Sequence, residues 1–443
     1  MFGGLLKSTS LAALVAVAGV AVSGVSAQAA DLGGNCCADL EERIAELEAT
    51  TARKGNRKVS LTVSGWVNEA VMFFDDGVES NAYQVTNMVA QSRVRFVGSA
   101  KIDQKLSAGY LMELGINGAR SDDVSSPTDD SASATSAANA VGVRHSTWWI
   151  NHADLGKVWV GQTSQATDAI TEVTTANTGH FVAGHATQFG AMQARNSATG
   201  AVGSRLNLFF GGTGLTSTAG TDSAQIGEGN RRNLVKYDTP TLAGFVASAS
   251  VGEDKFWDVA LRYAGEFSGF KLAAGIGYEV TTDGNVTPTG TGERNCINNV
   301  VGGSDVQCQQ LGISGSIMHV PTGLFVTGVY GQRSDDKATN NKESTHWRAV
   351  AGIEQKFTSL GKTTLFGEYA QFDIGNTAAL GIGSAAAEST VWGLGLNQAI
   401  DAAAMDLYFK YNNVGDLSTT SVAGVKTRFE DVQVIMTGAR IQF

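Results

Sequence analysis

The sequence of 443 residues is poor in proline, cysteine and charge. It has only 4 prolines and 4 cysteines, and Asp, Glu, Lys and Arg together make up 17 % of the chain. Beyond the N-terminus, no window holds the roughly 20 consecutive apolar residues of a membrane-spanning helix. The net charge is −10, whereas a nucleic-acid partner would require a basic face. These absences argue against a helical membrane protein and against nucleic-acid binding.

Glycine is abundant instead, with 54 residues, which favours one large β architecture over two or three soluble domains. The stretch 231–280 shows the underlying pattern. Apolar residues alternate with charged or small ones: Trp257, Val259, Leu261 and Tyr263 against Asp258, Ala260, Arg262 and Ala264. A period of two places a β-strand between two different media. In a soluble sandwich the charged face would meet bulk water, whereas in a membrane barrel the apolar face meets lipid and the polar face a wet lumen.

The first 29 residues have the three parts of a secretory signal peptide. Lys7 supplies a thin basic region, residues 11–22 an apolar core, and Ala27-Gln28-Ala29 a cleavage site. An uncleaved membrane anchor is the alternative, but the apolar run is short and Asp31 follows at once. Export and cleavage would place the mature chain in an oxidising compartment.

Residues 30–58 change to a helical period. Leu40, Ile44 and Leu47 form the a/d seam of a coiled coil, and a basic linker follows at 52–58. About two heptads do not make a stable isolated helix in water, so identical subunits would have to supply the partners. We expect a trimeric stalk on the periplasmic side, which in a second interpretation tethers the barrel to peptidoglycan or a periplasmic envelope protein. A lone amphipathic helix is the simpler alternative.

Residues 59–443 are predicted to form an all-β fold, a transmembrane barrel of sixteen antiparallel strands. Tight turns and long polar loops alternate between the strands, which is the asymmetry of outer-membrane barrels. The predicted strands are 59–73, 88–102, 107–116, 143–151, 157–162, 231–238, 244–252, 256–266, 270–280, 309–319, 324–333, 345–357, 363–372, 388–399, 405–414 and 427–442.

The connection at 163–229 is by far the longest, and loops of such length are usually functional or disordered. Its segment Arg205–Phe210 would make a seventeenth strand, but single-chain bacterial barrels have even strand counts, so we assign the segment to the loop. Sixteen strands leave an aqueous channel. Only this loop is long enough to fold inside and narrow it.

Three segments resemble the alphaproteobacterial outer-membrane porins: CCADLEERIAELEATTARKGNRKVSLTVSGWVNEAV, RHSTWWINHADLGKVWVGQ and RRNLVKYDTPTLAGFVASASVGEDKFWDVALRYAGEF. The resemblance implies a homotrimer in outer-membrane lipid and lipopolysaccharide, with the third outer loop folded into the lumen. It also implies passive diffusion of ions and small hydrophilic solutes. The terminal Phe443 resembles the aromatic signal read by the barrel-insertion machinery.

Selectivity is expected where charges face each other across the narrowed lumen. The basic wall is predicted to consist of inward arginines: Arg93, Arg95 and Arg144, extended by Arg262, Arg348 and Arg440. Asp168 and Glu172 early in the loop would form the acidic side, since acids on this loop oppose wall arginines in porins of this shape. The alternative is the ordinary polarity of a barrel interior.

Two further groups of residues lie on predicted outer loops. Cys296 and Cys308 enclose a short loop, where a disulfide would reduce its conformational freedom. Acidic pairs such as Asp122-Asp123 suit divalent cations that bridge lipopolysaccharide, but such pairs are more often merely solvated. No other cofactor is expected. His180 and His185 lack partner cysteines for a zinc site, and no serine has a nucleophile-elbow context, so we expect no enzyme.

Overall fold

The computed structural model describes residues 58–124, 141–182, 184–211, 225–252, 255–282, 307–335, 343–375 and 384–443. The expected signal peptide, the seam Leu40, Ile44 and Leu47, and Cys296 lie outside these residues. Among the described residues, no helix is both long and apolar enough to cross a membrane.

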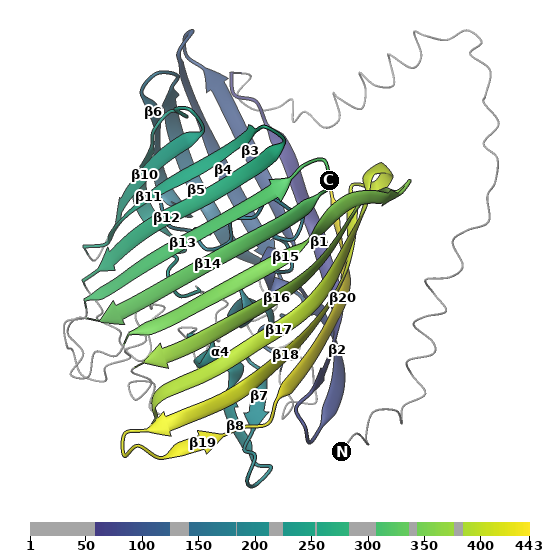
Figure 1. Cartoon of the computed structure of the whole chain (residues 1–443). Coiled ribbons are helices and arrows are strands. Elements are labelled where there is room, and N and C mark those ends of the chain that lie inside the picture. Colours follow the sequence, from purple (N-terminus) through teal and green to yellow (C-terminus); the bar gives the residue numbers. More distant parts are fainter. Residues whose placement is uncertain are drawn as a thin grey trace, which may run out of the picture. The chain divides into compact units, whose positions relative to one another are not determined.

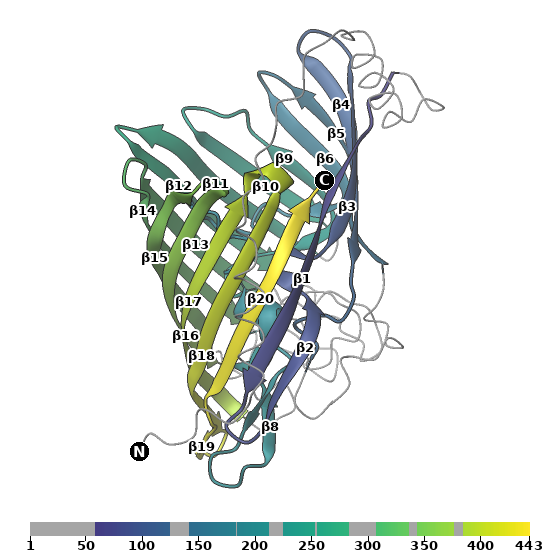
Figure 2. The same ribbon diagram turned by 90° about the vertical axis from the view of Figure 1, so that its right-hand side faces the viewer.

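The described chain is a closed barrel of sixteen antiparallel strands, as predicted. The wall strands are β1 (Thr62–Asp75), β3 (Arg93–Lys101), β4 (Leu106–Ile116), β5 (Val141–His152), β6 (Gly156–Ser164), β9 (Arg231–Asp238), β10 (Phe245–Gly252), β11 (Trp257–Phe267), β12 (Phe270–Thr281), β13 (Cys308–His319), β14 (Leu324–Asp335), β15 (Ser344–Thr358), β16 (Gly361–Gly375), β17 (Ser384–Ile400), β18 (Met405–Ser421) and β20 (Val432–Gln442). Each pairs with its neighbour along the chain, and β1 pairs with β20 to close the barrel (Figures 1 and 2).

The predicted alternation is confirmed in the two strands where the sequence shows it most clearly. In β11, Trp257, Val259 and Leu261 are each more than 40 % exposed on the outer wall, whereas Asp258 is buried inside. In β18, Leu407 faces outward and Lys410 inward. The outer wall is therefore apolar and the inner wall carries the charges, as a barrel in lipid requires.

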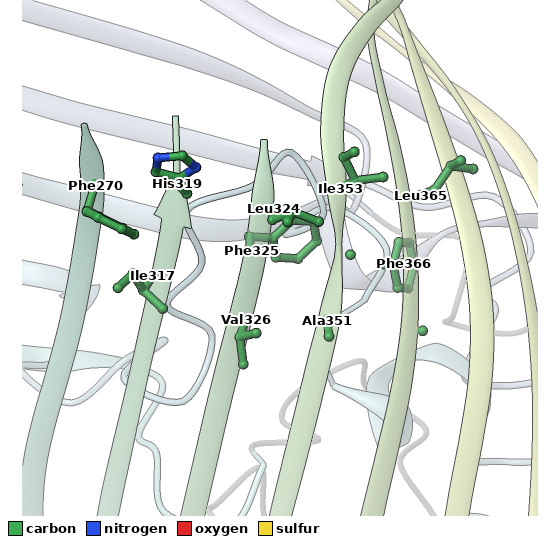
Figure 3. Close-up of a pocket in the computed structure, with 12 residues that line it drawn as sticks. Phe270, Ile317, His319, Leu324, Phe325, Val326, Ala351, Ile353, Leu365 and Phe366 are labelled. Carbon is green, nitrogen blue, oxygen red and sulfur yellow. The ribbon is translucent and has the colours of Figure 1, made fainter. Parts of the chain in front are cut away.

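The outer wall has a hollow of about 800 Å³ across β12 to β16 (Figure 3). Apolar side chains surround it, among them Phe270, Ile317 and Val326, and Gly352 and Gly367 also line it. His319 is its one titratable lining residue and lies near the short turns. The hollow belongs to the apolar wall.

Most predicted strands differ from the observed ones only at their ends, but two are interrupted. The second predicted strand, 88–102, begins only at Arg93, because residues 88–90 form the short 3-10 helix η1 (Met88–Ala90), capped by the Asn87 side chain. A separate strand, β2 (Ser80–Thr86), pairs with the outer half of β1 in its place. The last predicted strand, 427–442, is divided into β19 (Lys426–Arg428) and β20. At the first break the Asn87 side chain accepts a hydrogen bond from the Val89 N–H, which favours the turn over the ladder.

The long loop folds inside the barrel and has its own short elements. These are α3 (His185–Phe189), β7 (Gln193–Arg195), β8 (Val202–Arg205) and α4 (Leu206–Phe209). β7 and β8 pair only with each other, so the segment 205–210 belongs to the loop, as predicted. Their hairpin lies beside β19 (Figures 1 and 2), where Asn196 bridges to Phe429. This end of the barrel is opposite the tight turns.

A hydrophobic core lies inside the barrel rather than outside it. Loop residues Phe181, Phe189, Leu208 and Phe209 pack against inward apolar side chains of one wall: Met72 and Phe74 on β1, Phe372 on β16, Val391 on β17, Val414 on β18, and Val434 and Met436 on β20. We call the loop residues 181–210 the plug. One side of the lumen is therefore filled by protein.

Candidate functional site: a loop-narrowed lumen

The early part of the loop, residues 165–178, lies against the inner faces of β10 to β13. Side chains of the wall bind its backbone. Asp258 accepts hydrogen bonds from the backbone N–H of Thr167 at 2.7 Å and from its hydroxyl at 2.8 Å. The Ser314 hydroxyl donates to the carbonyl of Ile170, and the Ser316 hydroxyl accepts from the N–H of Thr175 at 3.0 Å. These bonds satisfy loop backbone groups that have left water.

Glycines on the wall let the loop approach closely. A Cβ added to Gly312 would lie 2.0 Å from the carbonyl oxygen of Gly227, and one added to Gly331 would lie 2.0 Å from that of Ile226. Both distances are far below van der Waals contact, so a larger residue would push the returning end of the loop off the wall. The backbone of the returning loop therefore lies directly on the backbone of the wall strands.

Arg262 and Arg348 anchor the loop. Arg262 donates from its two terminal nitrogens to the carbonyls of Ala166 and Asp168, both at 2.7 Å. Arg348 donates to the carbonyls of Thr171 at 3.2 Å and Val182 at 3.1 Å. Both arginines face inward as the alternation predicts. Their guanidinium groups are turned to the loop backbone rather than grouped with the other predicted arginines, so we assign them to holding the loop.

The plug is fixed by a buried charge cluster. Lys410 on β18 lies 2.8 Å from Glu368 on β16, and both side chains are fully buried. His185 at the start of α3 lies 3.3 Å from the same carboxylate, and Gln188 accepts a hydrogen bond from Lys410 at 3.1 Å. A charge pair buried to this degree requires good geometry and additional hydrogen bonds, which α3 supplies.

Three arginines on β3 and β5, beyond the wall that the plug covers, share one glutamate. Arg93 and Arg95 on β3 lie 3.1 and 2.8 Å from the Glu113 carboxylate on β4, and Arg144 on β5 lies 2.7 Å from it. Glu113 is almost fully buried, while the Arg95 side chain is 36 % exposed. We call these four residues the arginine cluster. With three guanidinium groups on one carboxylate, it keeps an excess of positive charge.

A bulge directs Arg144 into the lumen. The register between β4 and β5 shifts at Glu113 and Leu114, so that Glu113 faces His145 while Leu114 faces Val143. Strict alternation from the inward Thr147 and His145 would turn residue 144 outward. The extra residue lets Arg144 reach both Glu113 and the Gln91 amide oxygen, 2.7 Å away. Bulges commonly redirect a side chain in this way.

The loop carboxylates form the other charged group. Asp168 lies 4.0 Å from Arg231 at the start of β9 and also interacts electrostatically with Arg144. Desolvation, with repulsion from Asp168, raises the pKa of Glu172 to about 7. Glu228, near the end of the loop, accepts a hydrogen bond from the Thr171 N–H at 3.2 Å, and burial raises its pKa well above the usual value. The predicted pair of acids is thus a group of three.

The remaining predicted residues are only partly described. Cys308, at the start of β13, is buried and disulfide-bonded, while its predicted partner Cys296 lies outside the described residues. Asp122 pairs with Arg120. Within the described ranges, no group of three or more His, Cys, Asp or Glu side chains is placed to hold a metal ion.

Two further predicted residues lie at the C-terminal end of the chain. Arg440 pairs with Asp406 at 2.7 Å, and the exposed Phe443 exchanges backbone hydrogen bonds with Gly65. The roles of these residues stay predictions.

Sequence reasoning did not identify Glu113 and Arg231 as parts of the site. Glu113 is the residue directly opposite Arg95 in the ladder, so an assigned register could have found it. Arg231 is the first residue of β9, where the loop re-enters the wall. No periodicity shows that a residue at this junction reaches the loop carboxylates.

The arrangement sets positive and negative groups on the borders of a narrowed aqueous passage. Such charges orient water and solutes and filter ions without any covalent chemistry.

Comparisons with known proteins agree with this geometry. The sequence profile described as Gram-negative porin matches residues 10–419. Among solved structures, the anion-selective porin from Comamonas acidovorans superposes with a TM-score of 0.54 at 15 % identity, covering 87 % of this chain and 100 % of that one. The trimer form of OmpT, an outer membrane protein of Vibrio cholerae, gives 0.50 at 15 % identity over 87 % and 99 %. At these identities the likeness concerns the fold alone. No curated protein matches the sequence.

Proposed function

Because the chain belongs to the Gram-negative porin family, we propose that the arginine cluster and the loop carboxylates form the filter of its channel. The protein is an outer-membrane porin, a water-filled channel for passive diffusion of ions and small hydrophilic solutes. One observation carries the proposal. The plug fills the β16–β20 side of the lumen with a hydrophobic core, so the passage runs past the charged side.

The charges of the filter favour anions. Four arginines, Arg231 and the three of the arginine cluster, face Glu113, Asp168 and Glu172. With Glu172 partly protonated near neutral pH, positive charge is in excess. A narrow passage with walls of low dielectric concentrates ions of opposite sign, so the filter should admit anions more readily than cations.

Planar-bilayer recording of the purified protein under a salt gradient tests this proposal. Wild type should open in nanosiemens steps with a reversal potential on the anion side. Arg93→Ala/Arg95→Ala should shift the reversal potential toward cation selectivity, because two positive charges leave the filter. A folded barrel that does not conduct would contradict the channel. A conducting double variant with unchanged selectivity would contradict the filter.

A solute-selective channel is the second candidate, and the filled half of the lumen favours it. A narrower passage makes closer contact with a solute than an open sixteen-stranded lumen does. Saturable block of the current by one solute, absent for solutes of similar size, would support this candidate. Block that depends on size alone would support general diffusion.

The assembly is proposed on separate grounds. The coiled-coil seam at Leu40, Ile44 and Leu47 needs partner helices, which supports a homotrimer with a periplasmic stalk. The three quoted segments support an alphaproteobacterial porin working in lipopolysaccharide, without enzymatic activity. Deletion of residues 31–55 separates the roles of the stalk. If the trimer is lost on size-exclusion chromatography, the stalk is required for assembly. If the trimer persists and only attachment to the envelope is lost, the stalk acts as a tether.

A further inference from the structure

Two tryptophans face the lumen, although the lipid interface is the usual place for tryptophan in a barrel. Trp149 on β5 and Trp159 on β6 are directly opposite each other in the ladder, with ring centroids 6.3 Å apart. Trp148 and Val158, their chain neighbours, are exposed on the outer wall, so alternation turns both indoles inward. Neither tryptophan touches the arginine cluster in the described contacts, and the filter does not use them.

The two indoles hold a lysine. The Lys157 ammonium lies 4.1 Å from the ring centroid of Trp149 and 3.7 Å from that of Trp159. A second ammonium, that of Lys236 on β9, lies 5.5 Å from the Trp159 ring. In the described part of the chain, neither ammonium donates a hydrogen bond. A cation–π contact positions a cation without cancelling its charge, so both lysines keep their donors for an anion.

The nearest carboxylate is already occupied. Asp238 accepts hydrogen bonds from the Trp159 indole N–H and the Ser248 hydroxyl, both at 2.7 Å, and lies 4.0 Å from the Lys236 ammonium. The Arg262 guanidinium, turned to the loop carbonyls, adds a third positive charge. Asp168, Asp258 and Glu228 lie near Arg262 and offset its charge, whereas Lys157 and Lys236 share only Asp238 among the described carboxylates, so the charge beside the two indoles is positive.

A cavity of about 480 Å³ opens beside these groups, beneath the early loop. Lys236, Arg262 and Ser248 line it together with the carboxylates of Asp168 and Asp238, and Val246, Ala264 and Ala273 add apolar surface. Its size falls in the range of small-molecule sites, and its two cationic side chains lie beside that apolar surface. A small carboxylate has the matching shape, with a charged end and an apolar body.

We infer that Lys157 and Lys236, held by Trp149 and Trp159, form a second binding site for small carboxylates in the channel. This inference rests on the proposed function, because the site lies in the lumen past the filter. Lys236 is five residues from Arg231 along β9, or about 16 Å toward the short turns. A carboxylate released from the filter reaches the lysines next. Conduction through several weak sites in series is a recurring property of selective channels.

Block of the chloride current by succinate, with neutral succinamide as the matched probe, tests this site. Recordings in about 0.1 M KCl keep the Debye length near 10 Å, so the lysine charges are not screened. Wild type should be blocked by succinate and not by succinamide. Lys157→Gln/Lys236→Gln should need about tenfold more succinate for half block, the size of one lost charge-assisted contact. Trp149→Leu should give a smaller change of the same sign.

Lys356→Gln, which removes an exposed lysine at the short-turn end of β15, is the matched control and should behave as wild type. Equal block of wild type and the double lysine variant would overturn the second site while leaving the porin intact. Unchanged block in Trp149→Leu would overturn the role of the tryptophans. Absence of any wild-type current would instead contradict the channel itself.

Discussion

The two sides of the lumen are built from the same antiparallel strands and differ in what their inward positions carry. From β3 to β9 these positions hold Arg93, Arg95, Lys157 and Lys236, and water reaches part of them. On β1 and from β16 to β20 many hold apolar residues, which the plug covers. A β-barrel wall is thus equally able to line a channel and to support a protein core, because the backbone satisfies its own hydrogen bonds in both cases.

The largest effect is expected at the buried charge pair that holds the plug against the filled side of the lumen. Lys410→Met should weaken the seating of the plug by about 3–5 kcal/mol, because Glu368 would remain buried with its ammonium partner removed. Limited proteolysis of loop 165–230 and single-channel noise would both increase. Lys410→Met/Glu368→Leu removes both charges and should recover most of the loss. Equal proteolysis of the single and double variants would contradict a stabilising pair.

The next effect concerns the outer wall, which should tolerate charge far less than the open inner wall. Ile276 lies in an outward apolar row with Leu261 and Ile313. Ile276→Arg should cost about 2–4 kcal/mol in a urea titration of the barrel folded in lipid vesicles, since the arginine enters hydrocarbon. Ser107→Arg, on the inner face of β4, should change the free energy of unfolding far less. Similar losses for both variants would invalidate the assigned faces.

A smaller effect separates anchoring arginines from filtering ones. Arg262→Ala frees the carbonyls of Ala166 and Asp168, so the early loop should move and change single-channel conductance by about twofold or more. Ion selectivity should change less than in Arg93→Ala/Arg95→Ala, because the arginine cluster is intact. The ratio of conductance change to reversal-potential shift distinguishes the two classes. Identical ratios for Arg262→Ala and Arg93→Ala/Arg95→Ala would show that these arginines act together as one basic wall.

The smallest effect is a pH dependence of selectivity. The pKa of Glu172 is raised to about 7, so this carboxyl is mostly neutral at pH 5 and ionised at pH 9. Raising the pH through 7 adds one negative charge to the filter, and the reversal potential should move toward the cation side by a few millivolts. Asp168, Glu228, Arg231 and Arg348 surround this carboxyl and influence the midpoint. Glu172→Gln should remove the step, and its persistence would assign the titration to another loop carboxyl such as Glu228, whose pKa burial also raises.

The barrel could be predicted from the sequence because alternation is a local signal. The alternation within 257–261 and within 407–410 shows which side chains face lipid and which face the lumen, without knowledge of any partner strand. The signal fails where side chains interrupt the ladder, as at Asn87, which caps the turn of η1. At Arg144 the predicted inward position is correct, but it depends on a bulge that makes two neighbouring residues face inward, which alternation does not show.

The filter could be predicted only in part, because it depends on which strands the loop meets. Inward arginines were identifiable, but Arg93 and Arg262 have the same pattern in sequence and different partners in space. The plug is the clearest case. Leu206 and Phe209 belong to an apolar segment that the sequence could assign only to the loop, and nothing local shows that Phe372 and Val414 on the wall pack against it.

The seating of the early loop has a consequence for how this channel can diversify. The wall binds main-chain carbonyls of the loop through Arg262, Arg348 and Ser314 and a main-chain N–H through Asp258. It meets the returning end of the loop at glycines such as Gly312. Every residue type except proline presents the same backbone groups. Substitutions at loop positions whose side chains do not contact the wall can therefore accumulate without loosening this part of its attachment. Descendants of this protein can acquire new permeabilities by changing the loop side chains alone, while the wall stays as it is.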